Sequence, residues 1–372
     1  MRPTFAEIDL RAINTNLKNI RKKIGGHPLI MAVVKANAYG HGVLPVVRSI
    51  IKNRSAQYLG VAIVEEGIEL RKTKIRYPIH VFTAPLREQL GLYVRNDLEA
   101  TICDNSIAKE LNKIAGKQGK KASVHVKIDT GMGRIGVPAK DAIRFVESLS
   151  KYQNLFVKGI WTHFATSDEK DLSFANEQLR IFRSIVTALE LKGIHIPLVH
   201  CANSGAILQM PDSYFDMVRP GIMMYGYTPS IDTRKTVDLL PAMSLHARVG
   251  FVKTVEKGTS ISYSRRFYSK KRTKIASVTV GYADGYFRTL TNKISVLMNG
   301  KRFSVAGTIC MDQIMIDVAN ENVKAGDEVI LIGRSGKDQI SAWEISKAIG
   351  TIPYEVTCAV SQRVPRKYVN GK

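Results

Sequence analysis

Residues 28–42 read PLIMAVVKANAYGHG, and they join a wholly apolar run to a lysine, small residues, a tyrosine and two glycines. An apolar run of this length is typical of a strand that is buried on both faces. The lysine at its end, Lys35, has two readings. Its stem can carry the ammonium out to water, as most lysines do, or the amine can be held desolvated as a nucleophile that forms a Schiff base. The stretch alone leaves both open.

Apolar, β-rich runs recur along the chain with helix-periodic segments between them. We expect strands at 29–35, 58–63, 79–83, 99–104, 123–129, 157–164, 197–203 and 215–221. We expect helices within 43–54, 64–74, 106–117, 139–150 and 173–193. Eight strands that alternate with helices over about 220 residues predict an α/β fold, an eight-stranded β/α barrel. A doubly wound open sheet is the alternative, but no G-x-G-x-x-G motif follows the first strand.

The pattern changes after about residue 238. Short β runs separated by turns follow, with one clear helix in SAWEISKAIG at 341–350. Such a succession predicts an all-β domain. We therefore expect two domains, a barrel over 1–238 and a C-terminal β-domain over 239–372.

Composition limits the class of protein. The 372 residues are 45% hydrophobic and 23% charged, as in an ordinary globular protein, and no apolar stretch could span a bilayer. Glu7 and Asp9 lie where a signal peptide would need its apolar region. Four cysteines without C-x-x-C or metal-ligand spacing favour a reducing cytoplasm and indicate no metal site.

The formal net charge of +23 suggests nucleic-acid binding as an alternative function. However, residues 1–238 hold 34 Lys and Arg against 22 Asp and Glu, and residues 239–372 hold 21 against 10. The one dense cluster, RRFYSKKRTK at 265–274, comes without a zinc finger, a helix-turn-helix or an aromatic RNA-binding motif. A generally basic surface that attracts anions explains the charge better.

Polar residues gather at the expected carboxyl ends of the strands, where barrel enzymes place their chemistry. They are Lys35, Thr83, Asp104, Lys127 with Asp129, His163, Asn203 with Ser204, and Arg219. Each one alone is more often a structural hydrogen-bonding residue. Their shared position predicts that they converge on one cavity.

Nine motifs in order extend this interpretation over nearly the whole chain. They are AVVKANAYGHG, KIDTGMGRIG, THFATSDE, HCANSGA, VRPGIMMYG, SYSRRF, GYADG, CMDQIMIDV and PYEVTCAVSQRVPR. Together they closely resemble the alanine racemases, bacterial enzymes that depend on pyridoxal 5′-phosphate. The resemblance implies a barrel, a C-terminal β-domain, and a homodimer in which each β-domain completes the partner's active site.

The resemblance also implies how the cofactor is held. Lys35 matches the lysine that carries it as a Schiff base, which needs an unprotonated amine. Residues that match the family's phosphate contacts are Tyr39, Ser204, Gly221, Ile222 and Tyr354. Arg219 matches the arginine that faces the pyridine nitrogen, where most pyridoxal enzymes place a carboxylate. An arginine cannot take the ring's proton, so the ring is a weaker electron sink and the reaction is confined to proton removal and return.

Racemisation needs an acid/base on each face of the α-carbon. By resemblance, Lys35 is one, and Tyr263 of the partner subunit is the other, with His163 linking Arg219 to that tyrosine. Arg134 and the backbone amide of Met311 match the residues that bind the substrate carboxylate.

Three further positions have implied roles. Lys127 matches a lysine that carries a carbamate in many members, an anion that would pair with the neighbouring Arg134. Tyr282 and Asp312 match residues that line the active-site entrance. The implied product, D-alanine, supplies peptidoglycan synthesis in the cytoplasm.

Other functions on related scaffolds stay open. A broad-specificity racemase keeps both bases and enlarges the pocket, and sequence cannot size a pocket. A basic amino-acid decarboxylase of similar fold needs a GGG phosphate loop, which is absent, and a carboxylate at position 219. A single-domain cofactor-binding barrel would lack the C-terminal segment that includes Tyr263. The basic tract 265–274 beside Tyr263 would make the site entrance unusually positive.

Overall fold

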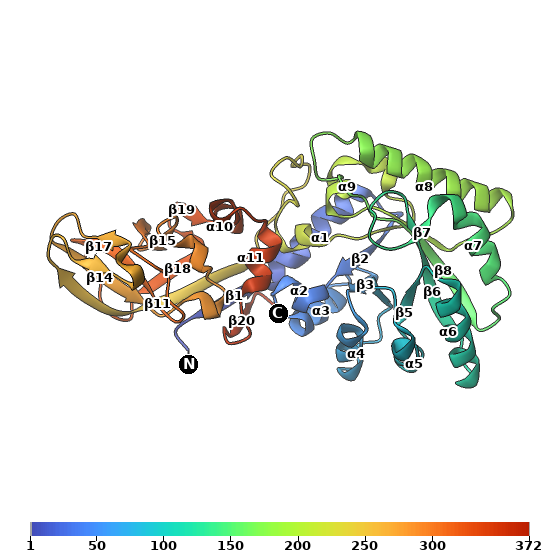
Figure 1. The fold of residues 1–372 in the computed structure, drawn as a ribbon, viewed down its shortest axis with the longest axis horizontal. Helices are drawn as coiled ribbons and strands as arrows, with labels where there is room; N and C mark the ends of the chain where they lie inside the picture. Colours follow the sequence, from blue (N-terminus) through green and yellow to red (C-terminus); the bar gives the residue numbers. More distant parts are fainter. Residues whose placement is uncertain (1, 372) are drawn as a thin grey trace. The chain divides into compact units, whose positions relative to one another are not determined.

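A computed structural model describes residues 2–371 of the chain, which divide into two units (Figure 1). One unit comprises residues 13–38 and 43–240. The other comprises residues 241–371 together with residues 2–12 and 39–42. The C-terminal unit therefore takes in the first strand of the chain and a four-residue excursion from the barrel.

The first unit contains a parallel sheet that curls into a nearly closed barrel, as the sequence predicts. Its strands, in spatial order, are β10 (Met217–Val218), β2 (Leu29–Val33), β3 (Tyr58–Val61), β4 (Ile79–Val81), β5 (Glu99–Ile102), β6 (Ala122–Asp129), β8 (Leu155–Trp161) and β9 (Leu198–His200), with β7 (Val137–Pro138) beside β6. Between β9 and β10, the Asp216 amide donates to the Val199 carbonyl (3.1 Å) and the Arg219 amide donates to that of Ala202 (2.9 Å). All eight predicted strands are confirmed, and the open-sheet alternative is wrong.

Helices follow the strands and cover the outside of the barrel, which Figure 1 shows from α3 to α8. They are α1 (Leu10–Ile24), α3 (Val43–Lys52), α4 (Val64–Lys72), α5 (Leu90–Arg95), α6 (Asn105–Lys117), α7 (Ala142–Leu149), α8 (Ser173–Leu191) and α9 (Ser204–Gln209). The segment labelled α2 (Lys35–Tyr39) is a turn with non-helical dihedral angles. In α7, the buried residues are Ala142, Phe145, Val146 and Leu149. This i, i+3, i+4, i+7 spacing presents one apolar stripe to the sheet.

The second unit is built on a mainly antiparallel sheet. Its main path runs β16 (Lys301–Ser304), β15 (Ser295–Met298), β18 (Glu328–Ser335), β11 (Met243–Val255), β1 (Phe5–Asp9) and β20 (Arg366–Val369), the last two of which form a parallel pair. Strand β14 (Thr273–Val278) pairs with β11 and β17 (Ile314–Ala319), β19 (Asp338–Ile340) pairs with β18, and β12 (Ser260–Ile261) pairs with β13 (Phe267–Tyr268). Ala6 of β1 lies opposite both Leu245 and Arg366, which explains why the N-terminus belongs to this unit.

Alternation of side chains decides the register of this sheet. In β11, Met243, Leu245, Ala247 and Val249 are buried, whereas the residues between them are half-buried or exposed. Period-two burial is what a strand with one face on a core requires. The unit contains the predicted helix as α10 (Ala342–Ile349) and a second one, α11 (Pro353–Ala359), which the sequence interpretation missed.

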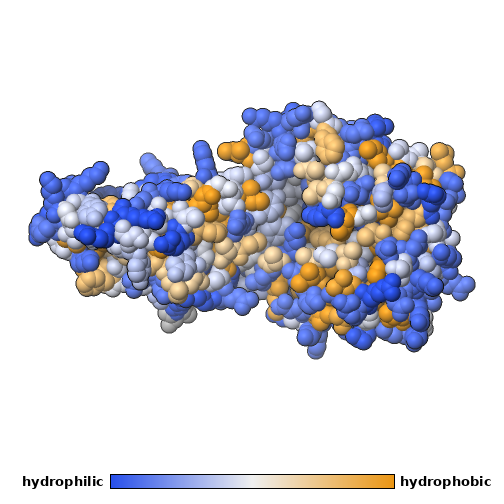
Figure 2. Space-filling view, viewed as in Figure 1, coloured by the Kyte–Doolittle hydropathy of each residue, from blue (hydrophilic) through white to orange (hydrophobic). Residues whose placement is uncertain are grey.

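The described residues include no helix that is both long and apolar enough to cross a membrane. Figure 2 shows hydrophilic residues spread over the visible face of both units, with apolar residues scattered among them.

Candidate active site

Lys35 follows the carboxyl end of β2 and begins a left-handed turn. Residues 36–39 all have φ between 51° and 55°, the left-handed region, although none is glycine. This conformation costs about 1–2 kcal/mol per residue, because Cβ approaches the following carbonyl oxygen. Strain of this kind persists only where neighbouring groups hold it, and it gathers at functional sites.

Two side chains hold the left-handed turn. The Glu66 carboxylate on α4 accepts hydrogen bonds from the amides of Ala36 (2.6 Å) and Ala62 (2.7 Å). The Asn37 side-chain oxygen accepts from the amide of Val43 (2.7 Å), the first residue of α3. The turn is thus tied to the end of β3 and the start of α3, which fixes the backbone from which Lys35 projects.

Arg219 lies just beyond β10 and is 3% exposed. Its Nη1 donates to His200 Nδ1 (2.9 Å), and its Nη2 donates to the carbonyl oxygens of Thr162 and Cys201 (2.9 Å each) and lies 3.4 Å from His163 Nδ1. Within residues 2–371, no carboxylate pairs with this guanidinium. Its hydrogen bonds to the described residues all use the two terminal nitrogens, and its guanidinium also lies 5.1 Å from the centroid of the Trp161 ring, so Nε–H stays available to a ligand.

The surroundings of Arg219 decide which groups are charged. Burial lowers the pKa of Arg219 to about 10, so it remains a cation at neutral pH. Burial and this cation hold the pKa of His163 and of His200 well below the usual range, so both rings are neutral. The charges of Lys127, Arg134 and Lys35 also lower the pKa of His163. Of the residues predicted to converge, Arg219, His163, Lys127 and Lys35 lie close enough to influence one another.

Lys127 in β6 is 1% exposed. Its Nζ donates to the Ile128 carbonyl (3.1 Å) and lies 4.6 Å from the centroid of the Trp161 ring. Burial, and then the charge of Arg219, lower the pKa of Lys127 to about 7. A large fraction of this amine is therefore unprotonated at neutral pH, which is unusual for a lysine.

The loop after β6 carries Arg134, whose side chain is exposed. Asp129 organises this loop, because its Oδ1 accepts hydrogen bonds from the amides of Gly131 (3.0 Å) and Gly133 (3.1 Å). Gly136 (φ 135°) packs so closely that an added Cβ would lie 2.6 Å from the Asp129 nitrogen. Asp129 is therefore a loop-forming residue beside the site.

The predicted phosphate-binding residues of the barrel form one cluster. The Ser204 hydroxyl accepts a hydrogen bond from the Gly221 amide (3.0 Å), which joins the start of α9 to the turn at 222–225. Gly205 leaves no room for a side chain, because its Cβ would lie 2.6 Å from the Ser167 carbonyl oxygen. A hydroxyl and backbone amides are donors of the kind that hold a phosphate.

Tyr39 and Tyr354 belong to the C-terminal unit and pack together, with ring centroids 5.8 Å apart. Gly40 makes this packing close: its φ is 83°, and a Cβ would lie 2.1 Å from the Thr357 carbonyl oxygen on α11. Any larger residue at 40 would clash with the backbone of α11 at Thr357.

Tyr263 is 69% exposed in the single chain. Its neighbours Ser262 and Ser264 have φ of 66° and 61°, and the hairpin β12–β13 brackets the segment. The Thr308 hydroxyl donates to the Tyr263 carbonyl (2.8 Å), and the Ser262 hydroxyl donates to the Thr308 carbonyl (2.5 Å). The tyrosine is thus presented outward on a constrained backbone.

Tyr282 and Met311 lie on two segments that are joined by backbone hydrogen bonds. The Tyr282 amide donates to the Cys310 carbonyl (3.0 Å), and the Ala283 amide donates to that of Met311 (3.1 Å). Gly281 allows this approach, because a Cβ there would lie 2.2 Å from the Met311 oxygen.

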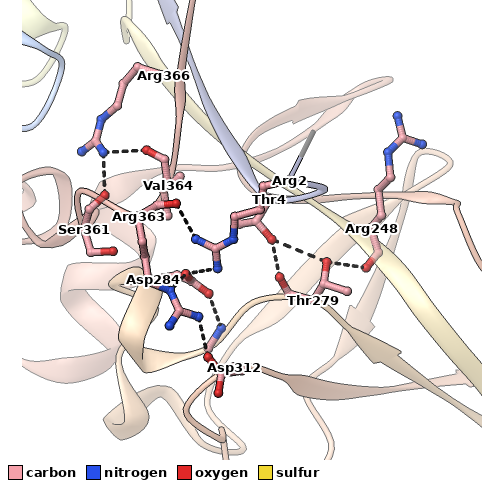
Figure 3. Close-up of polar contacts among 11 residues, drawn as sticks. Arg2, Thr4, Arg248, Thr279, Asp284, Asp312, Ser361, Arg363, Val364 and Arg366 are labelled. Atoms are coloured by element: carbon pink, nitrogen blue, oxygen red, sulfur yellow. Dashed lines mark hydrogen bonds and ion pairs between the residues drawn. The ribbon is translucent and has the colours of Figure 1, made fainter.

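A buried carboxylate, Asp284, holds these segments to the chain termini (Figure 3). It pairs with Arg2, with Arg363 Nε (2.7 Å) and with the Gly281 amide (3.0 Å). Arg363 also pairs with Asp312 through Nη2 (2.5 Å). Asp284 therefore fixes the position of Asp312, one of the predicted entrance residues.

Three predicted residues do not join the site. Asp104 is the N-cap of α6, accepting from the amides of Ser106 and Ile107, and Asn203 is the N-cap of α9, accepting from Ala206. Thr83 is exposed and makes only a backbone bond to the Ala62 carbonyl. Capping residues naturally follow strands in a barrel because each helix starts there, so position alone could not separate them from site residues.

Sequence reasoning missed the polar interior of the barrel beneath the site. His80, His125 and His200 each lie within an apolar strand run, in IHVFT, SVHVKID and PLVHCAN, and all three are fully buried. The recurrence of one histidine at similar depth in three strands was a usable signal. Glu66, which holds the Lys35 turn, gave no signal within its helix.

The comparisons with known proteins agree over both units. The model of the alanine racemase N-terminal domain matches residues 8–229, and that of the C-terminal domain matches residues 242–368. The chain belongs to the alanine racemase family. The family assignment leaves the nucleic-acid alternative without support.

Relatives are similar over their whole length. Alanine racemase 2 of Caldanaerobacter subterraneus subsp. tengcongensis is 46% identical over 371 residues, which cover 99% of this chain and 95% of the relative. Alanine racemase of Methanococcus maripaludis is 44% identical, with 99% of each chain covered. The solved structure of alanine racemase from Clostridium difficile 630 has a TM-score of 0.95 at 40% identity, covering 100% of this chain and 97% of that one.

Asp284→Asn should destabilise the C-terminal unit strongly. The neutral amide cannot balance two arginines, and it offers one acceptor oxygen where the buried Asp284 carboxylate accepts from Arg2, Arg363 and the Gly281 amide. Asp338→Asn is the matched control, because Asp338 pairs with Arg302 at the surface and should contribute little. Urea unfolding of the three proteins measures the difference. Equal losses in both variants would contradict the role assigned to Asp284.

Proposed function

We propose that this protein is an alanine racemase that interconverts L-alanine and D-alanine with pyridoxal 5′-phosphate as cofactor. The observation that carries the proposal is the Arg219 site: a buried cation fixed by neutral histidine and carbonyl acceptors, with no carboxylate beside it and Nε–H unused. Membership of the alanine racemase family supports the same function.

The residues present fit the cofactor. Lys35 would hold it covalently, and an N–H donor at Arg219 suits an unprotonated ring nitrogen. His163 stays neutral beside Arg219. The donors proposed for the phosphate are the Ser204 hydroxyl, the Ile222 amide and the hydroxyls of Tyr39 and Tyr354, while the Gly221 amide donates to the Ser204 oxygen and so orients its hydroxyl. When bound, pyridoxal phosphate withdraws electrons from the amino acid, so that its α-proton can be removed.

Two groups of the chain would move that proton. The Lys35 amine serves one face of the α-carbon, and the Tyr263 phenol serves the other. The exposure of Tyr263 and its constrained backbone suit a residue that a homodimer partner inserts into the site.

The remaining residues would recognise the substrate. Arg134 and the Met311 amide bind the alanine carboxylate, while Tyr282 and Asp312 line the entrance. D-alanine made in this way would supply peptidoglycan synthesis, and four free cysteines suit a cytoplasmic location.

Lys35→Ala should abolish both cofactor attachment and catalysis. The wild type should show absorbance near ~420 nm, and the variant should lose or shift this band. Chiral chromatography should detect racemisation of alanine in the wild type and none in Lys35→Ala. In the wild type, serine, lysine and arginine should react more slowly than alanine or not at all. Lys52→Ala, at the exposed end of α3, is the control and should behave as wild type. A colourless wild type that stays colourless with added cofactor would overturn the function, and equal rates on larger amino acids would favour a broad-specificity racemase.

Mixing two inactive variants tests whether the site is shared. A heterodimer of Lys35→Ala and Tyr263→Phe chains carries both changes in one site and neither in the other. After subunit exchange, activity should recover to about a quarter of wild type, because half of the dimers are mixed and each has one intact site. If both residues acted within one chain, mixing would recover nothing.

We also propose that Lys127 carries a carbamate. Its unprotonated amine would attack the carbon of CO2, forming an N–C bond and releasing one proton. The product is an anion near Arg134, which removes the electrostatic conflict among the buried cations of the site.

The carbamate should form at a pH where ordinary lysines do not react. With its pKa lowered to about 7, the Lys127 amine loses its proton as pH rises through 7 rather than through 10.5. In 13C-bicarbonate, a carbamate NMR signal should therefore be strong at pH 8 and fall below pH 6, and Lys127→Met should lack it. A signal that appears only above pH 10, or that persists in Lys127→Met, would contradict the proposal.

A further inference from the structure

A line of buried polar side chains runs through the barrel from Arg219 to Glu99. His200 Nε2 and His125 Nδ1 are 2.9 Å apart, and His125 Nε2 lies 2.8 Å from Glu99 Oε2. With the contact between Arg219 and His200 (2.9 Å), this makes three hydrogen bonds in series. The two histidines are fully buried and Glu99 is 5% exposed. The mechanism proposed above uses neither His125 nor Glu99.

The direction of every bond in the series follows from its first member. Arg219 can only donate, so His200 Nδ1 must accept. A neutral imidazole that accepts at Nδ1 carries its proton on Nε2, so His200 donates to His125 Nδ1. By the same rule, His125 carries its proton on Nε2 and donates it to the Glu99 carboxylate, which accepts only.

Glu99 is suited to end the series. Its second oxygen accepts from Lys158 Nζ (2.6 Å) and lies 3.4 Å from the Tyr58 hydroxyl. Burial raises the pKa of Glu99, but the hydrogen bonds from His125 and Lys158 outweigh it and leave the pKa below its usual value. The carboxylate therefore stays ionised and can only accept a hydrogen bond from His125.

The backbone is shaped to admit this series. Gly159 in β8 faces His125, and a Cβ at 159 would lie 2.2 Å from His125 Nδ1. A glycine within a strand weakens the strand and marks a close approach. Here it makes room for the imidazole ring.

We propose that Glu99 and His125 are positioning residues, which fix the hydrogen-bond direction of His200 and so hold Arg219 as a charged donor at the mouth of the barrel. The consequence for catalysis rests on the proposed role of Arg219, whereas the direction of the bonds does not.

Histidine tautomers test the inference without any reaction. In protein labelled with 15N-histidine, long-range 1H–15N correlations distinguish Nδ1–H, Nε2–H and the imidazolium, and His125→Asn and His200→Asn assign the signals. In the wild type, both histidines should be neutral with the proton on Nε2. An imidazolium or an Nδ1–H tautomer at either position overturns the inference.

Glu99→Gln should reverse the series. The glutamine side chain has one acceptor oxygen and one donor NH2 group, whereas its two neighbours, His125 and Lys158, both donate hydrogen bonds. The charged Lys158 should take the oxygen. The amide NH2 then faces His125 Nε2, which must accept, so the His125 proton must lie on Nδ1. His125 then donates to His200 Nε2, so the His200 proton lies on Nδ1 and points at Arg219, which is also a donor. We expect both protons on Nδ1 and a kcat for alanine about tenfold lower, with KM within about twofold of wild type. Unchanged tautomers in folded Glu99→Gln overturn the inference.

Lys158→Met provides the control and the rescue. It removes the same ion pair but keeps the carboxylate, so tautomers and kcat should match the wild type. In Glu99→Gln with Lys158→Met, the glutamine oxygen is free to accept from His125, and both tautomers and kcat should return towards wild type. A double variant that stays reversed overturns the inference.

If Glu99→Gln does not fold, the wild-type and Lys158→Met spectra decide the matter. Absence of racemisation with the expected tautomers would refute the proposed function and leave the bond direction intact.

Discussion

Arg219 keeps its positive charge inside the barrel without touching a carboxylate, and much of the surrounding structure follows from that constraint. An isolated buried charge is expensive unless polar groups replace the lost water. Here two carbonyl oxygens and two histidines do so. Burial, and then the positive charge of Arg219, keep these histidines neutral and make Lys127 easier to deprotonate. Loss of water and one cation thus act together on the ionisation of three neighbours.

The two units contribute different kinds of precision. In the barrel, the groups around Arg219 are fixed by hydrogen bonds between buried side chains. In the C-terminal unit, Tyr282, Met311 and Asp312 are exposed, and their backbone is fixed by the Asp284 cluster and by close glycine packing. Such an arrangement suits residues that act at a surface, because the backbone is rigid while the side chains remain accessible.

Periodic patterns in the sequence were enough for the eight barrel strands, most helices and the β-rich character of the second unit. Helix α11 was missed because its seven residues are too short to show a period. Among site residues, the family motifs located Lys35, Arg219 and Lys127, and the structure brings them within electrostatic range of His163. Asp104 and Asn203 follow strands as the expected site residues do, but each caps a helix, because a helix start and a site residue occupy the same place after a barrel strand.

Other features lie beyond reading one sequence. The left-handed turn after Lys35 was not predicted, because its course depends on Glu66, which is 30 positions beyond Ala36 in the chain. Likewise, the direction of the histidine series depends on Glu99 and Arg219 at its two ends. Contacts between residues far apart in sequence set both features, and local propensity carries no information about them.

The left-handed turn also bears on the order of events during synthesis. Residues 36–38 belong to the barrel unit, whereas residues 39–42 belong to the C-terminal unit and pack against α11. The side chains that hold residues 36–38, Glu66 and Asn37, are made early in synthesis, whereas α11 is among the last segments to leave the ribosome. The Lys35 turn can therefore form while the chain is unfinished, and Tyr39 is the one left-handed residue of the four whose ring partner, Tyr354, arrives last.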